Sequence, residues 1–361
     1  MKNVKTFLCT LLATLWLLSC NKDTTPTPEA GVSPDSGIAA DRYSVVIPGG
    51  SVNALAAALA EGTTVVLAPG LHTETGTVTV TGYHNIIGQP GAVLRLKSPA
   101  FTGTAPLAPG LHLYKAGGSS IMNVKIEASE SLGGTAILIN ESEKVTVQGC
   151  DISGFQYSVL VEKSPRVTLF KNRIQCNTAW QTGALPQAHG VVIVNGEGAR
   201  AEQNEISGAL FGFWACDKNG AYRRNYTHDN MVGFILCKVP TPALILPDGS
   251  LIGAQYSATR WIVRDNVSTG NYDNGIMVID GASYNTVIDN DVHGNGLAPL
   301  AGSAADIEVF ADSYLFGFLT PAAHHNVINS AKFPGTTIKN CGTNTTITGG
   351  TLWSTVVYPC R

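Results

Sequence analysis

The sequence predicts an all-β solenoid of stacked parallel coils, closed at its N-terminal end by a short helix. Two observations carry this prediction. Glycine-led strand segments that begin at Gly190, Gly212, Gly233 and Gly275 recur about every 21 or 22 residues once insertions are removed, a period in the range of stacked repeats. The chain also contains 39 glycines and short runs of Val, Ile and Thr. That composition favours strands and tight turns over helices.

Asparagines follow the strand segments at two fixed positions of this repeat. The first column contains Asn172, Asn204, Asn225, Asn266 and Asn290, and the second contains Asn177, Asn230, Asn271 and Asn295. Neighbouring coils stack at about 4.8 Å, so the side-chain amides of one column can hydrogen-bond to each other as a ladder. Asparagine also tolerates the left-handed backbone of a tight turn. We therefore predict structural roles for both columns.

This repeat resembles that of the pectin lyase-like superfamily, from about Tyr43 to the C-terminus. The resemblance implies a single-stranded right-handed parallel β-helix. We place one strand of each coil at the glycine-led segment, a second before the first-column Asn and a third after it. At the N-terminal end, Ser51 is expected to cap a helix that runs through Leu59 and ends at Gly62, and Thr64 begins the first coil.

The first 20 residues have the order of a secretory signal peptide. Lys2 and Lys5 precede an apolar run that ends at Cys20 and is too short to span a bilayer. Leu17-Leu18-Ser19-Cys20 resembles the lipobox of bacterial lipoproteins, which implies a lipid on Cys20. An ordinary signal peptide with a chance cysteine is the alternative.

Residues 21–40 are rich in Thr, Pro, Asp and Ser and are expected to form a disordered tether, which leaves 41–361 for the β-helix domain. Asn21-Lys22-Asp23 resembles the short export signal of some Bacteroidetes lipoproteins. We therefore expect a protein anchored to the outer membrane, facing the exterior or the periplasm. Charged residues make up only 14% of the chain, the net charge is −3, and no basic run is present, so nucleic acid is not an expected partner. The protein is expected to be a monomer.

Insertions between coils indicate where a solenoid binds its ligands. Four insertions, 178–188, 239–257, 297–304 and 313–323, border the first strand, whose outer face commonly forms the polysaccharide groove in the superfamily. The residues expected to point outward from this strand are Val192, Trp214, Ile235, Met277 and Glu308. The polar residues expected at or near its ends are Asn195, Asp217, Lys238, Asp280 and Asp312.

Among these residues we predict a catalytic group and a substrate-binding group. Asp217, Lys238 and Asp280 are the predicted catalytic residues, with one aspartate transferring a proton and the lysine neutralising a uronate. Trp214, Glu308 and Asp312 are predicted to bind the substrate. The carboxylates could hold calcium, but we expect no cofactor and predict no metal site. The alternative is that the charges pair only for solubility and that loops cover the apolar outward positions.

These residues suggest a surface protein that binds or processes an extracellular polysaccharide, such as one containing uronic acids, as a lyase or hydrolase would. The alternative is a non-catalytic structural or adhesive β-helix. The sequence lacks the calcium-binding carboxylate cluster of pectate lyase-like enzymes, and Thr227-His228-Asp229-Asn230 shares only His-Asp with the Asp-Pro-His-Asp motif of alginate epimerase-like members. Fold alone does not supply a function.

The remaining predictions concern cysteines, histidines and arginines. Cys341 and Cys360 are expected to form a disulfide that closes the C-terminal stretch, whereas Cys216 and Cys237 should stack on neighbouring coils as free thiols or a strained bridge. His228 and His293 should lie two coils apart, too far to share a metal ion. His324 and His325 are expected to point to opposite sides of a surface turn. Arg223 and Arg264 are expected to form a salt-bridged outer face with Glu202.

Overall fold

The computed structural model describes residues 44–101, 105–130, 132–176, 188–238, 244–252, 256–297, 305–311, 313–315, 318–353 and 360. All of them belong to one compact unit, residues 42–361. The expected leader and tether lie outside these residues. In the described part, no helix is both long enough and apolar enough to cross a bilayer.

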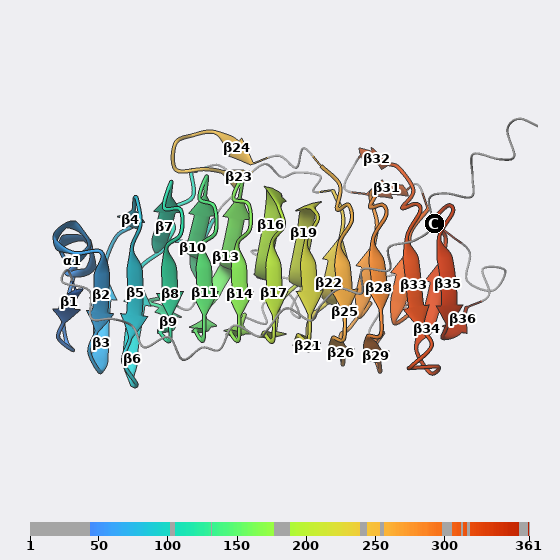
Figure 1. The fold of residues 1–361 in the computed structure, drawn as a ribbon, viewed down its shortest axis with the longest axis horizontal. Coiled ribbons are helices and arrows are strands. Elements are labelled where there is room, and N and C mark those ends of the chain that lie inside the picture. Colours follow the sequence, from blue (N-terminus) through green and yellow to red (C-terminus); the bar gives the residue numbers. More distant parts are fainter. Residues whose placement is uncertain are drawn as a thin grey trace, which may run out of the picture. The chain divides into compact units, whose positions relative to one another are not determined.

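Each full coil contributes one strand to each of three parallel sheets (Figure 1). In one such coil, β10 (Gly133–Asn140) is followed by β11 (Thr146–Gln148) and β12 (Asp151–Ser153), and β13 (Phe155–Glu162) then pairs with β10 in parallel. The right-handed parallel β-helix implied by the resemblance is therefore confirmed, including the position of each strand relative to the glycine and asparagine columns.

The strands of each sheet follow one another along the solenoid. The first sheet runs β4 (Val78–Val80), β7 (Leu111–Tyr114), β10, β13, β16 (His189–Glu197), β19 (Phe211–Lys218), β22 (Val232–Leu236), β27 (Ile276–Val278), β30 (Ile307–Val309), β34 (Thr337–Asn340) and β36 (Thr351–Leu352). The second sheet runs β1 (Ser44–Ile47), β2 (Thr64–Leu67), β5 (Asn85–Gly88), β8 (Ser120–Met122), β11, β14 (Thr168–Phe170), β17 (Arg200–Glu202), β20 (Ala221–Arg223), β25 (Ile262–Arg264), β28 (Thr286–Ile288), β33 (Val327–Ser330) and β35 (Thr346–Gly349). The third sheet runs β3 (Gly70–Glu74), β6 (Ala92–Leu96), β9 (Lys125–Ala128), β12, β15 (Arg173–Gln175), β18 (Glu205–Ser207), β21 (Tyr226–His228), β26 (Val267–Thr269) and β29 (Asp291–His293). Two hairpins lie outside the sheets, β23 (Leu244–Ile245) with β24 (Leu251–Ile252), and β31 (Ser313–Leu315) with β32 (Phe318–Thr320).

The core of the solenoid is a stack of inward-pointing apolar side chains. In β14, β15 and β18 only the middle residue is fully buried, because successive side chains of a strand point to opposite faces. Tyr222 and Phe234 stack in the interior with ring centroids 4.4 Å apart, next to the buried Trp261. By contrast, every residue of β10 and β13 is buried, so the first sheet is covered on its outer face too.

The asparagine columns form ladders, as predicted. In the first column, the Nδ2 atom of each residue donates to the Oδ1 atom of the next, from Asn172 through Asn204, Asn225 and Asn266 to Asn290, over 2.8 to 3.1 Å. In the second column, Asn230, Asn271 and Asn295 are linked in the same way, and Asn177 lies outside the described residues. A further pair, Asn285 with Asn326, was not predicted.

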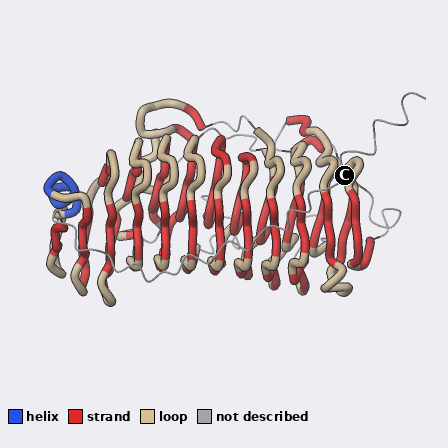
Figure 2. Tube along the Cα trace, viewed as in Figure 1, coloured by secondary structure: helices blue, strands red, loops and turns tan. Residues whose placement is uncertain are grey.

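The helix α1 (Leu55–Glu61) at the N-terminal end is the one drawn in blue in Figure 2. It ends at Gly62 as predicted, but the prediction that Ser51 caps it is wrong. Ser51 lies too far before the first turn, and its Oγ atom donates to the Pro48 oxygen instead. The Glu74 carboxylate of β3 accepts the Leu55 N–H at 2.9 Å. The first coil also begins earlier than expected, because β1 pairs with β2.

Candidate functional site

The row of outward residues predicted for the first sheet is present. Val192, Trp214, Ile235, Met277 and Glu308 stand opposite one another on five successive strands. This result confirms the register read from the glycine-led segments.

The outer face of this row is not an open groove. Its apolar side chains belong to a second hydrophobic cluster, here called the outer cluster, which lies outside the solenoid core. Its buried members include Leu107, Leu138, Leu160, Val192, Ile235, Leu244, Leu246, Ile252 and Met277. Figure 1 shows the β23–β24 hairpin above β7 to β13, and the Leu107 N–H donates to the Ile245 oxygen at 2.7 Å. The described part of this insertion, residues 244–252, therefore packs against the outer face of the first sheet over earlier coils, as the alternative in the sequence analysis anticipated.

Asp217, one of the three predicted catalytic residues, is fully buried at the end of β19. Its carboxylate lies against Gly196 of the preceding coil, where an added Cβ would be 3.5 Å from Asp217 Oδ2. The Trp261 indole donates to the main-chain oxygen of Asp217 at 3.2 Å, and no described group meets both the distance and the angle of a hydrogen bond to the carboxylate oxygens. Burial raises the pKa of Asp217 well above its ordinary value; Trp261 opposes this effect and Glu197 adds to it.

The other two predicted catalytic residues differ from each other in exposure. Asp280 is 1% exposed and occupies a left-handed turn at φ 54°, and the Ser257 hydroxyl donates to its main-chain oxygen at 2.8 Å. Lys238 is exposed and directly precedes the 239–257 insertion. Both aspartates are therefore withdrawn from the surface, and of the three residues only the lysine side chain reaches solvent.

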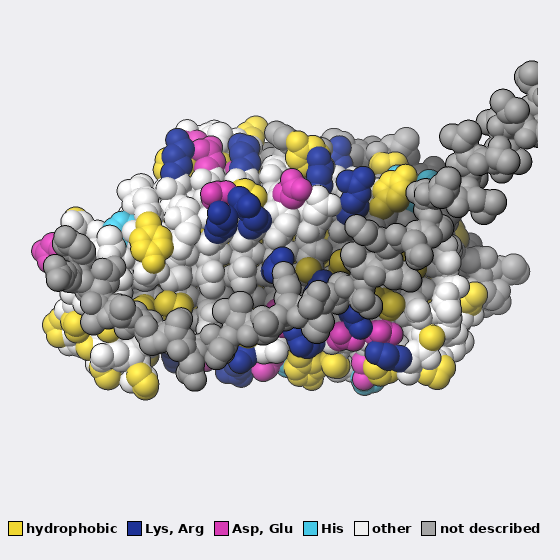
Figure 3. Space-filling model, in the orientation of Figure 1, with side chains coloured by type: hydrophobic (Ala, Val, Ile, Leu, Met, Phe, Trp, Pro, Cys, Tyr) yellow, Lys and Arg dark blue, Asp and Glu magenta, His cyan; other side chains and the backbone are white. Residues whose placement is uncertain are grey.

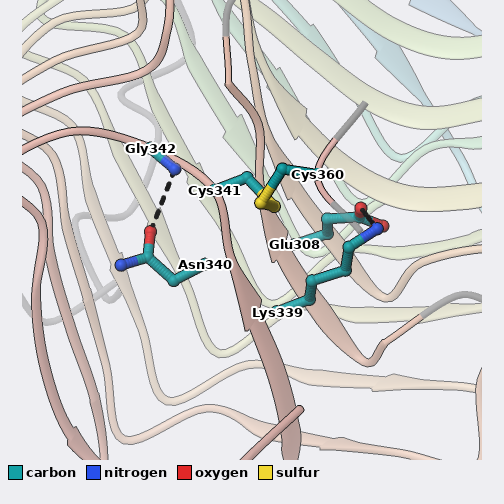
Figure 4. Close-up of a disulfide and its surroundings, with 6 residues drawn as sticks. All are labelled: Glu308, Lys339, Asn340, Cys341, Gly342 and Cys360. Carbon is teal, nitrogen blue, oxygen red and sulfur yellow. Dashed lines mark hydrogen bonds and ion pairs between the residues drawn. A yellow bond between two sulfur atoms is a disulfide. The ribbon is translucent and has the colours of Figure 1, made fainter. Parts of the chain in front are cut away.

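The predicted substrate-binding residues are also largely enclosed. Trp214 is half-buried, and its indole N–H donates to the Sγ atom of Cys237. Glu308 is 6% exposed and forms an ion pair with Lys339 at 2.8 Å, close to the Cys341–Cys360 disulfide (Figure 4). The predicted disulfide is thus present. Asp312 lies outside the described residues.

Two predictions about surface side chains are wrong in detail. Glu202 pairs with Arg224, because the left-handed backbone of Arg224 at φ 53° turns that side chain toward the neighbouring coil. Arg264 pairs instead with Asp265 and Asp289.

His324 and His325 do not point to opposite sides, because His325 also has a left-handed backbone, at φ 53°. Their Nδ1 atoms lie 2.9 Å apart. His228 and His293 do lie two coils apart, with Thr269 between them.

A row of exposed and half-buried aromatic and basic groups lies on the turns between the first and second sheets. Main-chain hydrogen bonds link Asn219 to Thr259, Arg260 to Ser283, Tyr284 to His324 and His325 to Thr343 across neighbouring coils. The residues Asn219, Arg260, Tyr284, His325 and Asn344 therefore form one column, and all have φ between 52° and 58°. We call the side chains of Lys218, Tyr256, Arg260, Tyr284, His324 and His325 the turn ridge.

The turn ridge presents ring faces beside cationic groups. Tyr284 is 55% exposed, and its ring stacks on that of His325 with centroids 5.2 Å apart and planes 16° apart. The Lys218 ammonium lies 3.5 Å from the centre of the Tyr256 ring, which is a cation–π contact. In Figure 3, basic and hydrophobic side chains gather along the upper edge, over the turns above β25 and β28.

The basic groups of the turn ridge lack acidic partners. Within the described ranges, no ion pair involves Lys218 or Arg260, whereas Arg166, at the same turn position of an earlier coil, pairs with Glu143 at 2.6 Å. No group of three or more His, Cys, Asp or Glu side chains there is arranged to hold a metal ion. The sequence reasoning missed this ridge, although Asn219, Arg260 and Tyr284 each lie six residues before an Asn of the first ladder.

Comparison with known proteins agrees with this architecture. Three parallel sheets, an inward apolar stack and asparagine ladders define a right-handed parallel β-helix. The family model described as "Right handed beta helix region" matches residues 109–292, and the chain belongs to that family. No curated protein sequence matches the chain.

Solved structures share the fold at low sequence identity. The polygalacturonase from Erwinia carotovora ssp. carotovora is 11% identical, with a TM-score of 0.52 over 86% of this chain and 94% of that one. PfbA, a surface adhesin of Streptococcus pneumoniae, is 12% identical, with a TM-score of 0.51 over 86% and 93%. The Dettilon tailspike protein is 14% identical, with a TM-score of 0.50 over 85% and 68%. At such identities the likeness concerns the fold.

Proposed function

We propose that the protein binds an anionic extracellular polysaccharide, such as a polymer of uronic acids, along the turn ridge, and that it does not cleave this polymer. The observation that carries the proposal is the pairing of exposed tyrosine rings with basic side chains that have no acidic partner in the described structure. Polysaccharide binding or processing also fits the polygalacturonase that shares the fold.

The chemistry of the ridge suits an acidic sugar chain. The exposed ring of Tyr284 can pack against the apolar face of a sugar ring. Arg260 offers paired N–H donors that match a carboxylate, and Lys218 adds a point charge. Because coils repeat at about 4.8 Å, these groups form a row that an extended polymer could follow.

Burial of the aspartates favours binding over cleavage. A general acid or base must come within hydrogen-bond reach of the reacting group, and Asp217 and Asp280 are 0% and 1% exposed. The catalytic roles predicted for Asp217, Lys238 and Asp280 therefore stay predictions, and the proposal does not depend on them. Lys238 is exposed beside the same turns and would add to the positive charge.

The proposal is tested with Arg260→Ala and Tyr284→Asn variants against polygalacturonate, alginate and the neutral polymer dextran. Tyr284→Asn removes the ring, keeps a residue type already found in the left-handed column, and should also weaken binding. We expect binding of the acidic polymers, weakened several-fold by Arg260→Ala and weakened further by added salt. Arg166→Ala is the matched control, because Arg166 has the same left-handed backbone but is paired with Glu143. Equal binding by the Arg260 and Arg166 variants would contradict the ridge, and new reducing ends or unsaturated products would contradict the absence of cleavage.

We also propose that a lipid on Cys20 anchors the protein to the outer membrane. The support is the Leu17-Leu18-Ser19-Cys20 sequence after the apolar run. Cys20→Ala should release or mislocalise the protein, whereas Cys9→Ala, within the leader, should leave it membrane-bound. Membrane fractionation that finds both variants bound like the wild type rules out this anchor.

A further inference from the structure

The pair His324 and His325 offers two imidazole nitrogens on one side of the chain. Adjacent residues in an extended strand point their side chains to opposite faces. Here the left-handed backbone of His325 breaks that alternation, and the two rings meet edge to face with centroids 5.1 Å apart. The Nδ1 atoms lie 2.9 Å apart.

We propose that His324 and His325 together bind one divalent transition-metal ion through their Nδ1 atoms, with Cu²⁺ as the preferred ion. Two ligands that lie at right angles around an ion, each about 2.0–2.1 Å from it, are about 2.9 Å apart. The separation of the two nitrogens matches this value. In the structure the two Nδ1 atoms are hydrogen-bonded to each other, so the donating ring would have to carry its proton on Nε2 instead, and both rings would have to rotate until their lone pairs meet at the ion. Right-angle geometry and imidazole ligands suit Cu²⁺ or Ni²⁺ better than a tetrahedral ion, and they do not suit Ca²⁺.

The surroundings hold the two rings in place. The Tyr284 ring stacks on the His325 ring. It also meets the His324 ring edge to face, with the two ring centroids 5.9 Å apart. On the next coil, the Nδ2 atom of Asn344 lies 3.4 Å from the Nε2 atom of His325. An amide can serve as donor or, after rotation, as acceptor. Asn344 can therefore support either tautomer of His325, including the one that frees Nδ1 for a metal ion.

With only two histidines bound to it, the ion would keep its other coordination positions open to water or to a molecule that the protein binds. This accords with the observation that no third His, Cys, Asp or Glu of the described residues completes the site. The ion would add positive charge at the C-terminal end of the turn ridge. Metal binding does not depend on the proposed polysaccharide function, and it is measured in the absence of any sugar.

Two substitutions remove the nitrogens while keeping residue types that the fold already accepts at these positions. His325→Asn places asparagine in the left-handed column that contains Asn219 and Asn344. His324→Thr places threonine in the bridge column that contains Thr259 and Thr343. His293→Ala and His228→Ala are the controls for exposed and half-buried histidines elsewhere.

The untagged full-length protein is titrated with Cu²⁺ by calorimetry, with glycine as a weak competitor, and the complex is examined by electron paramagnetic resonance. We expect one equivalent of Cu²⁺ with coupling to two imidazole nitrogens. Each of the two site variants should bind at least about tenfold more weakly, and the controls should match the wild type. Unchanged affinity and nitrogen coupling in either site variant, with unchanged circular dichroism, would overturn the proposal.

Discussion

The sulfur atoms of Cys216 and Cys237 lie 3.5 Å apart on neighbouring coils, and both side chains are buried in the outer cluster. The stacking predicted from the repeat is therefore confirmed, and the two cysteines are reduced and form no bridge with each other. The Trp214 indole donates to the Cys237 sulfur, so the residue expected to face a sugar instead contacts this thiol pair.

The four described cysteines that form no disulfide should resist alkylation in the native protein. All are buried, and burial raises the pKa of Cys150 to about 11 and that of Cys176 to about 12, so little reactive thiolate is present at neutral pH. Peptide mapping after iodoacetamide treatment should find Cys150, Cys176, Cys216 and Cys237 modified only after denaturation. Rapid native labelling of Cys237 would mean that the hairpin does not keep the outer cluster closed.

Replacing a ladder asparagine should destabilise the solenoid. Asn225→Ala removes the oxygen that accepts from both the N–H and the Nδ2 of Asn204. Each buried donor left without a partner costs about 1–3 kcal/mol. Thermal and urea unfolding should show this loss for Asn225→Ala and Asn266→Ala, but not for the exposed amide variant Gln175→Ala. Midpoints equal to those of the wild type for both ladder variants would refute the energetic role of the ladder.

The stability of the wild type should fall as pH rises above the ordinary aspartate range, because of Asp217. Burial raises the pKa of Asp217 in the folded chain, so between the unfolded and folded pKa values the unfolded state alone ionises. Protonation of Asp217 therefore stabilises the fold fully below the pKa that this residue has in the unfolded chain. This stabilisation is lost as pH rises through the pKa that Asp217 has in the folded chain.

Asp217→Asn and Asp217→Ser should remove this pH dependence. Serine is compatible with the turn, since Ser142 and Ser164 stack there on earlier coils. Urea unfolding midpoints should be measured from about pH 4 to 8. The midpoints of both variants should approach that of the wild type at acidic pH and exceed it at neutral pH. Parallel curves for wild type and both variants would show that Asp217 ionises in the folded protein as it does in the unfolded chain.

Glu308 and Lys339 should contribute to the stability of the fold only when both are present. They are 6% and 4% exposed, and Asn274 Nδ2 also donates to the glutamate at 3.2 Å. Lys339→Met should cost about 3–5 kcal/mol by leaving a buried carboxylate without its cation, whereas Glu308→Leu/Lys339→Met should restore most of that loss. The exposed pair Glu143 and Arg166 should contribute at most about 1 kcal/mol. If the double variant also keeps polysaccharide binding, Glu308 has no role in that binding.

The repeat period and the asparagine columns alone determined the fold, its register and the two ladders. Such features are visible in sequence because every coil must place the same side chain over the same neighbour, as Asn204 lies over Asn172. The Cys341–Cys360 disulfide was predictable for a similar reason, since the end of a stack has no further coil to cover it.

Only the tertiary structure decided which outward positions meet solvent. The 239–257 insertion could have left the first sheet open, but its hairpin returns over several coils and buries Leu138 and Leu160. No repeat specifies where such an insertion packs. Likewise, alternation along a strand places His324 and His325 on opposite sides, and a single left-handed residue at the turn reverses that result. Backbone conformation at the turns, which depends on contacts between coils, therefore decided the candidate site.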